Sequence, residues 1–243
     1  MTETITAPYS PKVFESLEDL LPATAKFKDL KGPEWLDEVG KGLLEKHAMT
    51  RTFGYQLLHR HFDLNDDEML VEVNNVSTPW PKEAASDSPR SKISGRSWKL
   101  VAKENSDSKK SAFMPYEFAY NSVCTKDDNT TDLTAPINLN DGNHKAFLDE
   151  FPASICNAGL DHIIALTAIP EIDHRGGLEI TQGRANILLL PGQFYSADAE
   201  NGVEATWYFP AGVPVNYWCS IKCLPGSGPS GHSGTSDHQP GGD

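Results

Sequence analysis

Residues 55–63 are the one stretch in which the periodicity of a strand places reactive side chains on one face. With the two-residue period of a β-strand, alternate side chains point to the same side. One side then carries Tyr55, Leu57, His59, His61 and Asp63. Turn-forming residues follow, and residues 69–73 resume a strand pattern. We therefore predict a β-hairpin in which His61 faces Glu72 across the two strands.

Further strand-like runs occupy the middle and the last third of the chain. They cover residues 98–103, 112–120, 161–169, 178–181, 184–190, 205–209 and 213–222. Apolar residues at helical spacing are found in residues 13–21, 32–47 and 144–159. Helices that are segregated from the strands, rather than alternating with them, favour an α+β class. We predict a mostly antiparallel sheet, barrel- or sandwich-like, with a few short and chiefly N-terminal helices.

The same patterns divide the chain into an arm, one domain and a tail. We expect a flexible arm over residues 1–12 and a single α+β domain over residues 13–224. Residues 225–243 are rich in Gly, Ser, Pro and His and are predicted to be a disordered tail. Residues 77–97, rich in Ser, Pro and charge, are predicted to be a long loop. Whether this loop is a lid stays open at the level of sequence.

The composition narrows the set of partners. The 243 residues carry a formal net charge of −13, which repels a nucleic-acid backbone, and we find no compact basic patch. No apolar run is long enough to span a bilayer, and the N-terminal residues lack the features of a signal peptide. We therefore expect a cytoplasmic protein with no nucleic-acid or membrane partner, and four reduced cysteines.

The histidine face allows three interpretations. Two histidines and a carboxylate are a ligand set of non-haem iron and zinc sites, so His59, His61 and Glu72 could hold a divalent metal such as Fe or Zn. Without metal, His59 or His61 would be catalytic and would move a proton, with Tyr55 as a proton donor. In the third interpretation, His61 and Glu72 are a cross-strand pair on a wet surface.

Gly54, His59 and His61 also resemble the opening of the cupin motif, a glycine followed by His-x-His and then a glutamate. The glycine stands one residue closer to the first histidine than in that family. Glu68 falls in the predicted turn, and no second motif with Pro and Gly around a histidine follows. On these residues we assign the chain to no family.

A second polar face is predicted around a tight turn at residues 182–183. In the simplest register Thr181 faces Arg184 and Glu179 faces Asn186. Arg184 and Glu179 would then be substrate-binding residues, because a guanidinium held by a carboxylate can bind an acidic group. The alternative is a surface ion pair of little energetic consequence.

Two classes of function follow from these patterns. The first is a small-molecule enzyme or ligand-binding protein with a semi-polar cavity in the sheet, lined by His59, His61 and Glu72. It would act by proton transfer, as an isomerase, lyase or cyclase does, or with a bound divalent metal. The second is a non-catalytic protein-interaction module with no metal. A pocket that encloses both histidines with Glu72 within reach favours the first class, and histidines on an open surface with an exposed apolar patch elsewhere favour the second.

Overall fold

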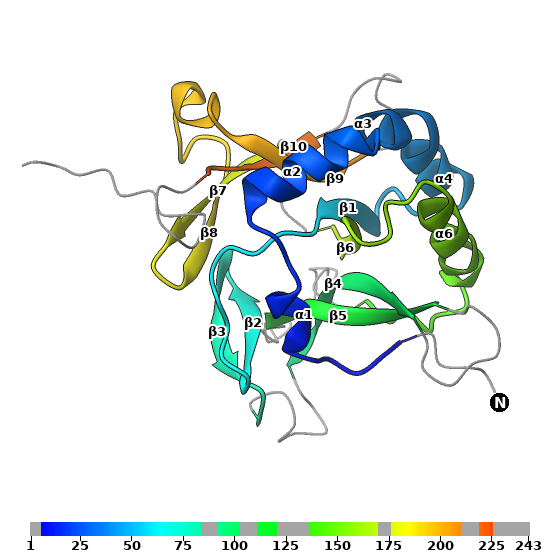
Figure 1. Ribbon diagram of the computed structural model, residues 1–243, viewed down its shortest axis with the longest axis horizontal. Coiled ribbons are helices and arrows are strands. Elements are labelled where there is room, and N and C mark those ends of the chain that lie inside the picture. Colours follow the sequence, from blue (N-terminus) through cyan, green and yellow to red (C-terminus); the bar gives the residue numbers. More distant parts are fainter. Residues whose placement is uncertain are drawn as a thin grey trace, which may run out of the picture.

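The computed structural model describes residues 6–83, 92–102, 111–120, 137–169, 176–209 and 219–225, without the side chains of Ser196 and Cys219. Ten strands in this part of the chain close into a barrel (Figure 1). In ring order they are β1 (Phe53–Leu57), β6 (Ile164–Ala168), β4 (Ile93–Ala102), β5 (Ser111–Tyr120), β2 (Glu68–Val73), β3 (Val76–Pro81), β8 (Ala185–Leu189), β7 (Gly177–Gln182), β10 (Cys219–Cys223) and β9 (Val203–Tyr208). Neighbours run antiparallel, except that β2 is parallel to β5 and β7 to β10. The predicted barrel-like, mostly antiparallel sheet is confirmed.

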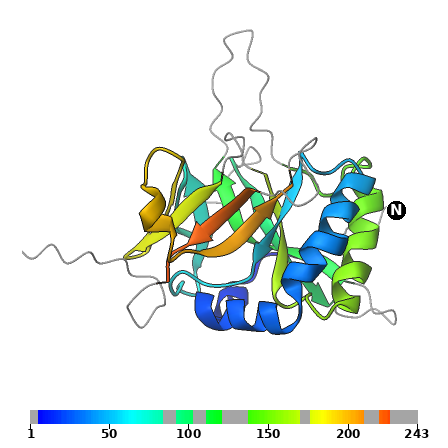
Figure 2. The same cartoon turned by 90° about the horizontal axis from the view of Figure 1, so that it is seen from above.

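The prediction of a few short, chiefly N-terminal helices is confirmed as well, although residues 13–21 are split between two helices and the second continues beyond them. The N-terminal helices are α1 (Lys12–Glu15), α2 (Leu20–Asp29), α3 (Gly32–Trp35), the π-helical turn η1 (Leu36–Gly40) and α4 (Lys41–Lys46). A longer helix, α6 (Lys145–Asn157), precedes β6, and a 3-10 turn, η2 (Ser196–Ala199), precedes β9. Figure 2 shows the blue α4 and the green α6 standing together against one side of the strands. Within the described ranges, no helix has both the length and the apolar character needed to cross a membrane.

The main core lies between these helices and the outer face of the barrel. In β1, Phe53 and Tyr55 point outward into this core and are fully buried. Phe53 stacks on Phe147 with ring centroids 5.5 Å apart, and Tyr55 stacks on Phe151 at 5.8 Å. Burying such a side chain contributes about 1.5–3 kcal/mol, so this layer sets the orientation of β1. Because side chains alternate along a strand, Gln56 faces the barrel interior.

Helix α1 closes one end of the barrel. Its apolar side chains join a cluster with residues from β2, β5, β6 and the segment after β1, namely Val13, Phe14, Leu17, Leu58, Phe62, Leu70, Tyr116 and Ala165. β6 and β5 are separated in the ring by β4, so the cluster spans the end of the barrel and does not follow its outer face. This end is the one at which the chain leaves β1.

The predicted hairpin between residues 55–63 and 69–73 is wrong. β1 ends at Leu57 and pairs with β6 and β9, while β2 pairs with β3 and β5. Beyond Leu57 the chain leaves the sheet, because Leu58 and Phe62 bury their side chains against α1. Burial against elements distant in sequence thus outweighed the local turn signal.

The predicted loop over residues 77–97 is wrong in large part. Residues 76–81 form β3 and residues 93–102 form β4. Residues 84–91 lie outside the described residues, so the lid stays untested. The strand over residues 213–222 is described only from residue 219 onward, as β10.

The β7–β8 hairpin forms, with its turn one residue later than predicted. Thr181 pairs with Asn186, and Gln182 pairs with Ala185. Gly183 takes the first turn position with φ of 61°, a left-handed conformation that glycine adopts without steric cost. Glu179, Thr181 and Asn186 stay on one face, as predicted, but Arg184 moves into the turn and off that face.

Candidate metal centre

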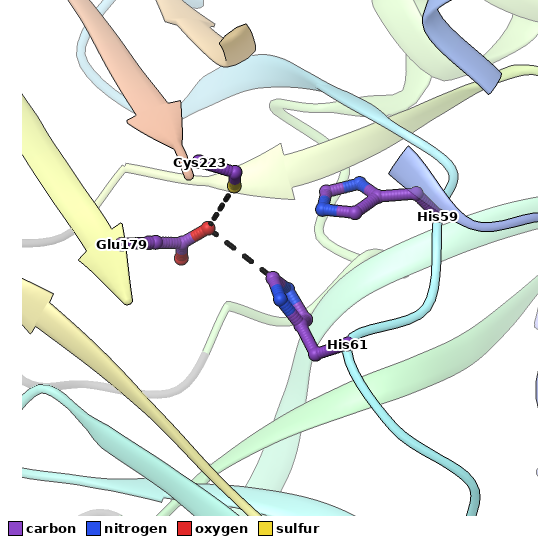
Figure 3. Close-up of side chains that lie close together, drawn as sticks. All are labelled: His59, His61, Glu179 and Cys223. Carbon is purple, nitrogen blue, oxygen red and sulfur yellow. Dashed lines mark hydrogen bonds and ion pairs between the residues drawn. The ribbon is translucent and has the colours of Figure 1, made fainter. Parts of the chain in front are cut away.

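Four buried side chains that can bind metal converge within the structure. His59 and His61 come from the segment after β1, Glu179 from β7 and Cys223 from β10. Figure 3 shows all four pointing toward one another from these three segments. One ligand atom from each lies within 4.8 Å of the others. The exposed fractions are 2% for each histidine, 9% for Glu179 and 0% for Cys223, so the cluster is a buried one.

The two histidines are turned inward by a strand-like alternation that continues past β1. Their imidazole centroids lie 4.6 Å apart, with the rings tilted edge to face. Arg60, between them, points the other way and donates from Nε to Asp19 at 2.8 Å. The sequence pattern that placed His59 and His61 on one side is therefore present, although the ladder predicted to carry it is absent.

Each histidine is oriented by a hydrogen bond from one ring nitrogen. Nδ1 of His59 lies 2.9 Å from the carbonyl oxygen of Leu57, which can only accept, so Nδ1 carries the proton. Nε2 of His61 lies 3.3 Å from the amide nitrogen of Asn186, and its Nδ1 lies 3.4 Å from Oγ1 of Thr181. The amide donates to Nε2, so Nδ1 donates to the threonine. Metal-binding histidines donate from one nitrogen to an oxygen and bind the metal through the other. In His61 that other nitrogen, Nε2, accepts from the Asn186 amide, so a metal ion would replace this hydrogen bond.

Glu179 and Cys223 are held next to each other, and burial disfavours the charged form of both. The thiol of Cys223 donates to Oε2 of Glu179 at 2.7 Å, and the same oxygen lies 3.9 Å from Nε2 of His61. Burial raises the pKa of Glu179, against the opposing bond from Cys223. Burial also raises the pKa of Cys223 well above its usual value, and the charge of Glu179 adds to this effect.

The donor set of this cluster suits a divalent cation. A cation of charge +2 that is bound by the Glu179 carboxylate, the Cys223 thiolate and two neutral imidazoles forms a cluster with no net charge. Metal binding would therefore leave no net charge buried in the cluster, which would otherwise be costly.

The spacing of the donor atoms also fits a metal. In a tetrahedral zinc site with bonds of about 2.0–2.3 Å, neighbouring ligand atoms lie about 3.3–3.8 Å apart. The ligand atoms of the four side chains lie within 4.8 Å of one another, so the longest of these distances must shorten by about 1 Å when a metal binds. Rotation of the side chains can supply this movement. Imidazole, thiolate and carboxylate together are donors that suit zinc and iron(II) better than magnesium or calcium.

The same four residues do not form a nucleophilic Cys–His–acid triad. In such a triad the thiol is activated by a histidine, which an acid then orients. Here the thiol of Cys223 donates to the carboxyl group of Glu179. The pKa of Cys223 is raised, whereas an activated cysteine has a lowered pKa.

The structure places the other predicted site residues away from this cluster. Glu72 forms an ion pair with Arg96 and does not face His61. Tyr55 is buried in the helix-covered core, where its hydroxyl donates to the carbonyl oxygen of Gly40 at 2.8 Å. Arg184 pairs with Glu68 at the rim and does not contact Glu179. Glu179 is instead a neighbour of His61.

Sequence reasoning did not assign Cys223 or Glu179 to the metal ligands. Glu179 was expected on a polar face with Thr181 and Asn186, and that face does point at His61, so a signal for it was present. No local signal pointed to Cys223, because it joins the cluster only through the pairing of β10 with β7.

A second polar group lies inside the barrel. We call Gln56, Ser97, Glu117 and Thr167 the inner polar group. The amide of Gln56 donates to both oxygens of Glu117 at 3.2 and 3.1 Å. Because β1 and β5 are not neighbours in the ring, these bonds span the interior. Glu117 itself stays half-buried.

Comparisons with known proteins add no relative to this picture. No family model matches the chain, and no curated protein and no solved structure matches it.

Proposed function

We propose that the protein holds a divalent transition metal inside its barrel, at His59, His61, Glu179 and Cys223, and acts there on a small polar molecule. Zinc is the leading candidate and iron(II) the second. The single observation that carries the proposal is the convergence of four buried ligand-type side chains from three segments. A catalytic metal keeps a position for its substrate, so the metal would supply Lewis acidity with three of the four side chains bound, or as a five-coordinate centre.

The surroundings of the cluster favour a functional role over a purely structural one. A structural zinc site is closed by its four ligands and needs no polar space beside it. Here the inner polar group, together with Arg96 and Glu72, lines the barrel interior, and Glu117, Arg96 and Glu72 all keep some exposure. Glu117 is also close enough to raise the pKa of Cys223 and of Glu179 through its charge. A small molecule in this interior would lie near the metal ligands.

A proton-transfer function without metal is the second candidate, and Glu179 favours it. Burial raises its pKa, and Nε2 of His61 lies 3.9 Å from its Oε2. A carboxyl group with a raised pKa beside a histidine is typical of proton-transfer sites. The interaction-module alternative was tied to histidines on an open surface. Both histidines are 2% exposed, which favours the first class of function.

The test is metal stoichiometry in the full-length protein. His232 and His238 should first be replaced by alanine, because histidines near the C-terminus can bind metal adventitiously. We expect one zinc or cobalt ion per chain, and a cobalt–thiolate absorption band that Cys223→Ser removes. Cys156→Ser is the matched control, because Cys156 is an exposed thiol outside the cluster.

Two further variants decide which acid belongs to the site. Glu179→Gln should weaken metal binding by more than the about 10- to 100-fold that a second-shell change costs. Glu72→Gln should leave it unchanged. Equal metal content in the parent protein and in a His59→Ala/His61→Ala variant would exclude the metal centre and leave proton transfer as the candidate.

A further inference from the structure

The β4–β5 ladder contains two register shifts that bring adjacent polar residues to its inner side. Ser97 pairs with Glu117 and Trp98 with Pro115, so the ladder passes over Arg96 on β4 and Tyr116 on β5. Trp98 packs outward in the helix-covered core. An extra residue in a strand re-aims its side chain, and such irregularities are frequent beside functional sites.

All four residues around the shifts face the barrel interior. Ser97 and Glu117 belong to the inner polar group. Arg96 interacts with Glu72 of β2 and Tyr208 of β9, and neither strand is a neighbour of β4. The ring of Tyr116 packs in the cluster with Leu70 and Ala165 at the closed end of the barrel.

The hydroxyl of Tyr116 is the unusual group among them. The residue is 1% exposed, and its hydroxyl makes no hydrogen bond of acceptable geometry within the described part of the chain. Burial raises the pKa of Tyr116, and the nearby hydroxyl of Ser97 opposes this rise. The oxygen of Ser97 is already engaged with Gln56, Glu117 and Thr167 at 2.8–2.9 Å. A buried hydroxyl without a hydrogen-bond partner destabilises the folded state. A tyrosine at this position, in place of a phenylalanine, therefore suggests that the hydroxyl has a role.

Glu117 supplies the complementary acceptor. A carboxylate has about four lone-pair sites, and Glu117 accepts from Gln56 at both oxygens and from Ser97 at one. An acceptor position therefore remains. This side of the interior carries two carboxylates, Glu117 and Glu72, and one guanidinium, Arg96. Its net charge is therefore negative, and it would repel an added anion.

We propose that Tyr116, Ser97 and Glu117 form a subsite for a hydroxyl or primary amide group of a neutral small molecule. Such a group accepts a hydrogen bond from Tyr116 and donates one to Glu117. The subsite specifies the class of molecule that the proposed metal centre acts on, and in that sense it rests on the proposed function. Its own binding step needs no metal.

Three fragments of nearly equal shape test this proposal by amide NMR shifts of the full-length, metal-free protein. Acetamide has both a donor and an acceptor, acetone has only an acceptor, and acetate is an anion. We expect acetamide to shift the resonances of β4 and β5 with a dissociation constant on the order of tens of millimolar. Acetone and acetate should bind about three- to tenfold more weakly, the effect of one lost hydrogen bond.

The variant Tyr116→Phe keeps the ring and removes only the hydroxyl. Acetamide should bind it about three- to tenfold more weakly, whereas Tyr195→Phe, in which an exposed tyrosine loses its hydroxyl, should bind as the parent does. Without ligand, Tyr116→Phe should unfold at a higher denaturant concentration, because an unsatisfied hydroxyl has been removed. Glu117→Gln should reduce the preference for acetamide over acetone, because an amide oxygen is a weaker acceptor than a carboxylate.

Failure of this proposal and failure of the metal centre are distinguishable. Selective acetamide binding in a protein that takes up no zinc or cobalt when the metal is added supports the subsite and excludes the centre. Metal binding together with equal binding of all three fragments, or of none, overturns the subsite. A less stable Tyr116→Phe variant that still binds acetamide unchanged overturns it too, because the hydroxyl would then serve an ordered water or the fold.

Discussion

His61 depends on two side chains of the β7–β8 hairpin for its orientation. Thr181 accepts from Nδ1 and Asn186 donates to Nε2, and Thr181 also lies 3.4 Å from the amide oxygen of Asn186. The threonine is thus a positioning residue for a proposed metal ligand. Residues of this kind are typically worth 10- to 100-fold in metal affinity.

We predict that Thr181→Val weakens zinc binding by about 10- to 100-fold, because Nδ1 of His61 loses its acceptor. The change keeps the shape of the side chain. Competition with a chromophoric chelator measures the affinity. Thr24→Val is the matched control, since the hydroxyl of Thr24 is also buried but donates to the carbonyl oxygen of Leu20 in α2. Equal losses in the two variants would rule out the positioning role.

At the scale of elements, the β7–β8 hairpin places Glu179 and Arg184 on different sides, although the sequence pattern predicted that they would bind substrate together. Because the turn lies one residue later than expected, Glu179 stays on the inner face while Arg184 reaches outward across the rim. Arg184 donates to the carboxylate of Glu68 on β2, with Nη1 and Oε1 3.1 Å apart, and to the carbonyl oxygen of Asp63 at 3.2 Å. It therefore ties the hairpin to the chain before β2.

We predict a small, pH-dependent contribution of this pair to stability. The hydrogen bond from Arg184 lowers the pKa of Glu68, so the pair stabilises the fold above the ordinary pKa of glutamate. That stabilisation is lost as the pH falls through the lowered pKa. Arg184→Met should cost less than about 1 kcal/mol near neutral pH, because both groups are partly exposed, and still less in acid.

Urea unfolding at neutral and acidic pH measures this difference, with Arg51→Met as the control for removing one exposed positive charge. A loss that is the same at both pH values would contradict the ion-pair explanation. Zinc binding should be unchanged in Arg184→Met, since the guanidinium lies outside the cluster.

At the scale of the molecule, the proposed metal would join parts of the chain that are far apart in sequence. The segment after β1, strand β7 and strand β10 each supply a ligand, and β10 is the last strand of the described chain. The folded state brings these ligands together, and the unfolded chain does not. Metal binding is therefore coupled to the stability of the whole barrel.

We predict that zinc raises the free energy of unfolding, by about 2.7 kcal/mol at a free concentration one hundred times the dissociation constant. Chelation should reverse the rise. The His59→Ala/His61→Ala variant should not respond to zinc, and the parent should not respond to magnesium, which prefers oxygen ligands. Thermal or urea unfolding with His232 and His238 replaced measures the effect. A rise of equal size in the double variant would point to binding elsewhere.

Much of the architecture could be predicted from the sequence, because periodicity is a property of the local backbone. The two-residue period put His59 and His61 on one side, and this holds although they lie outside a strand. Helical spacing located the N-terminal helices, and their separation from the strands indicated an α+β class. Pro33 lies in the first turn of α3, as its fixed φ favours.

Pairing between distant strands could not be predicted in this way. Glu72 was matched to His61 because the two runs are adjacent in sequence and separated by turn formers. In the structure each run pairs with other strands, since the apolar side chains of β1 bury against helices and those after β1 bury against α1. The acid next to the histidines is consequently Glu179, and Glu72 turns to Arg96.

The sequence by itself determined which side chains share a side within each short segment, because a strand repeats every two residues whatever it pairs with. Only the tertiary structure decided which segments meet. That choice depends on how apolar faces are buried together across the whole chain, which no local window contains. It brought Glu179 and Cys223 to the two histidines, and it placed Tyr116 with Glu117 inside the barrel.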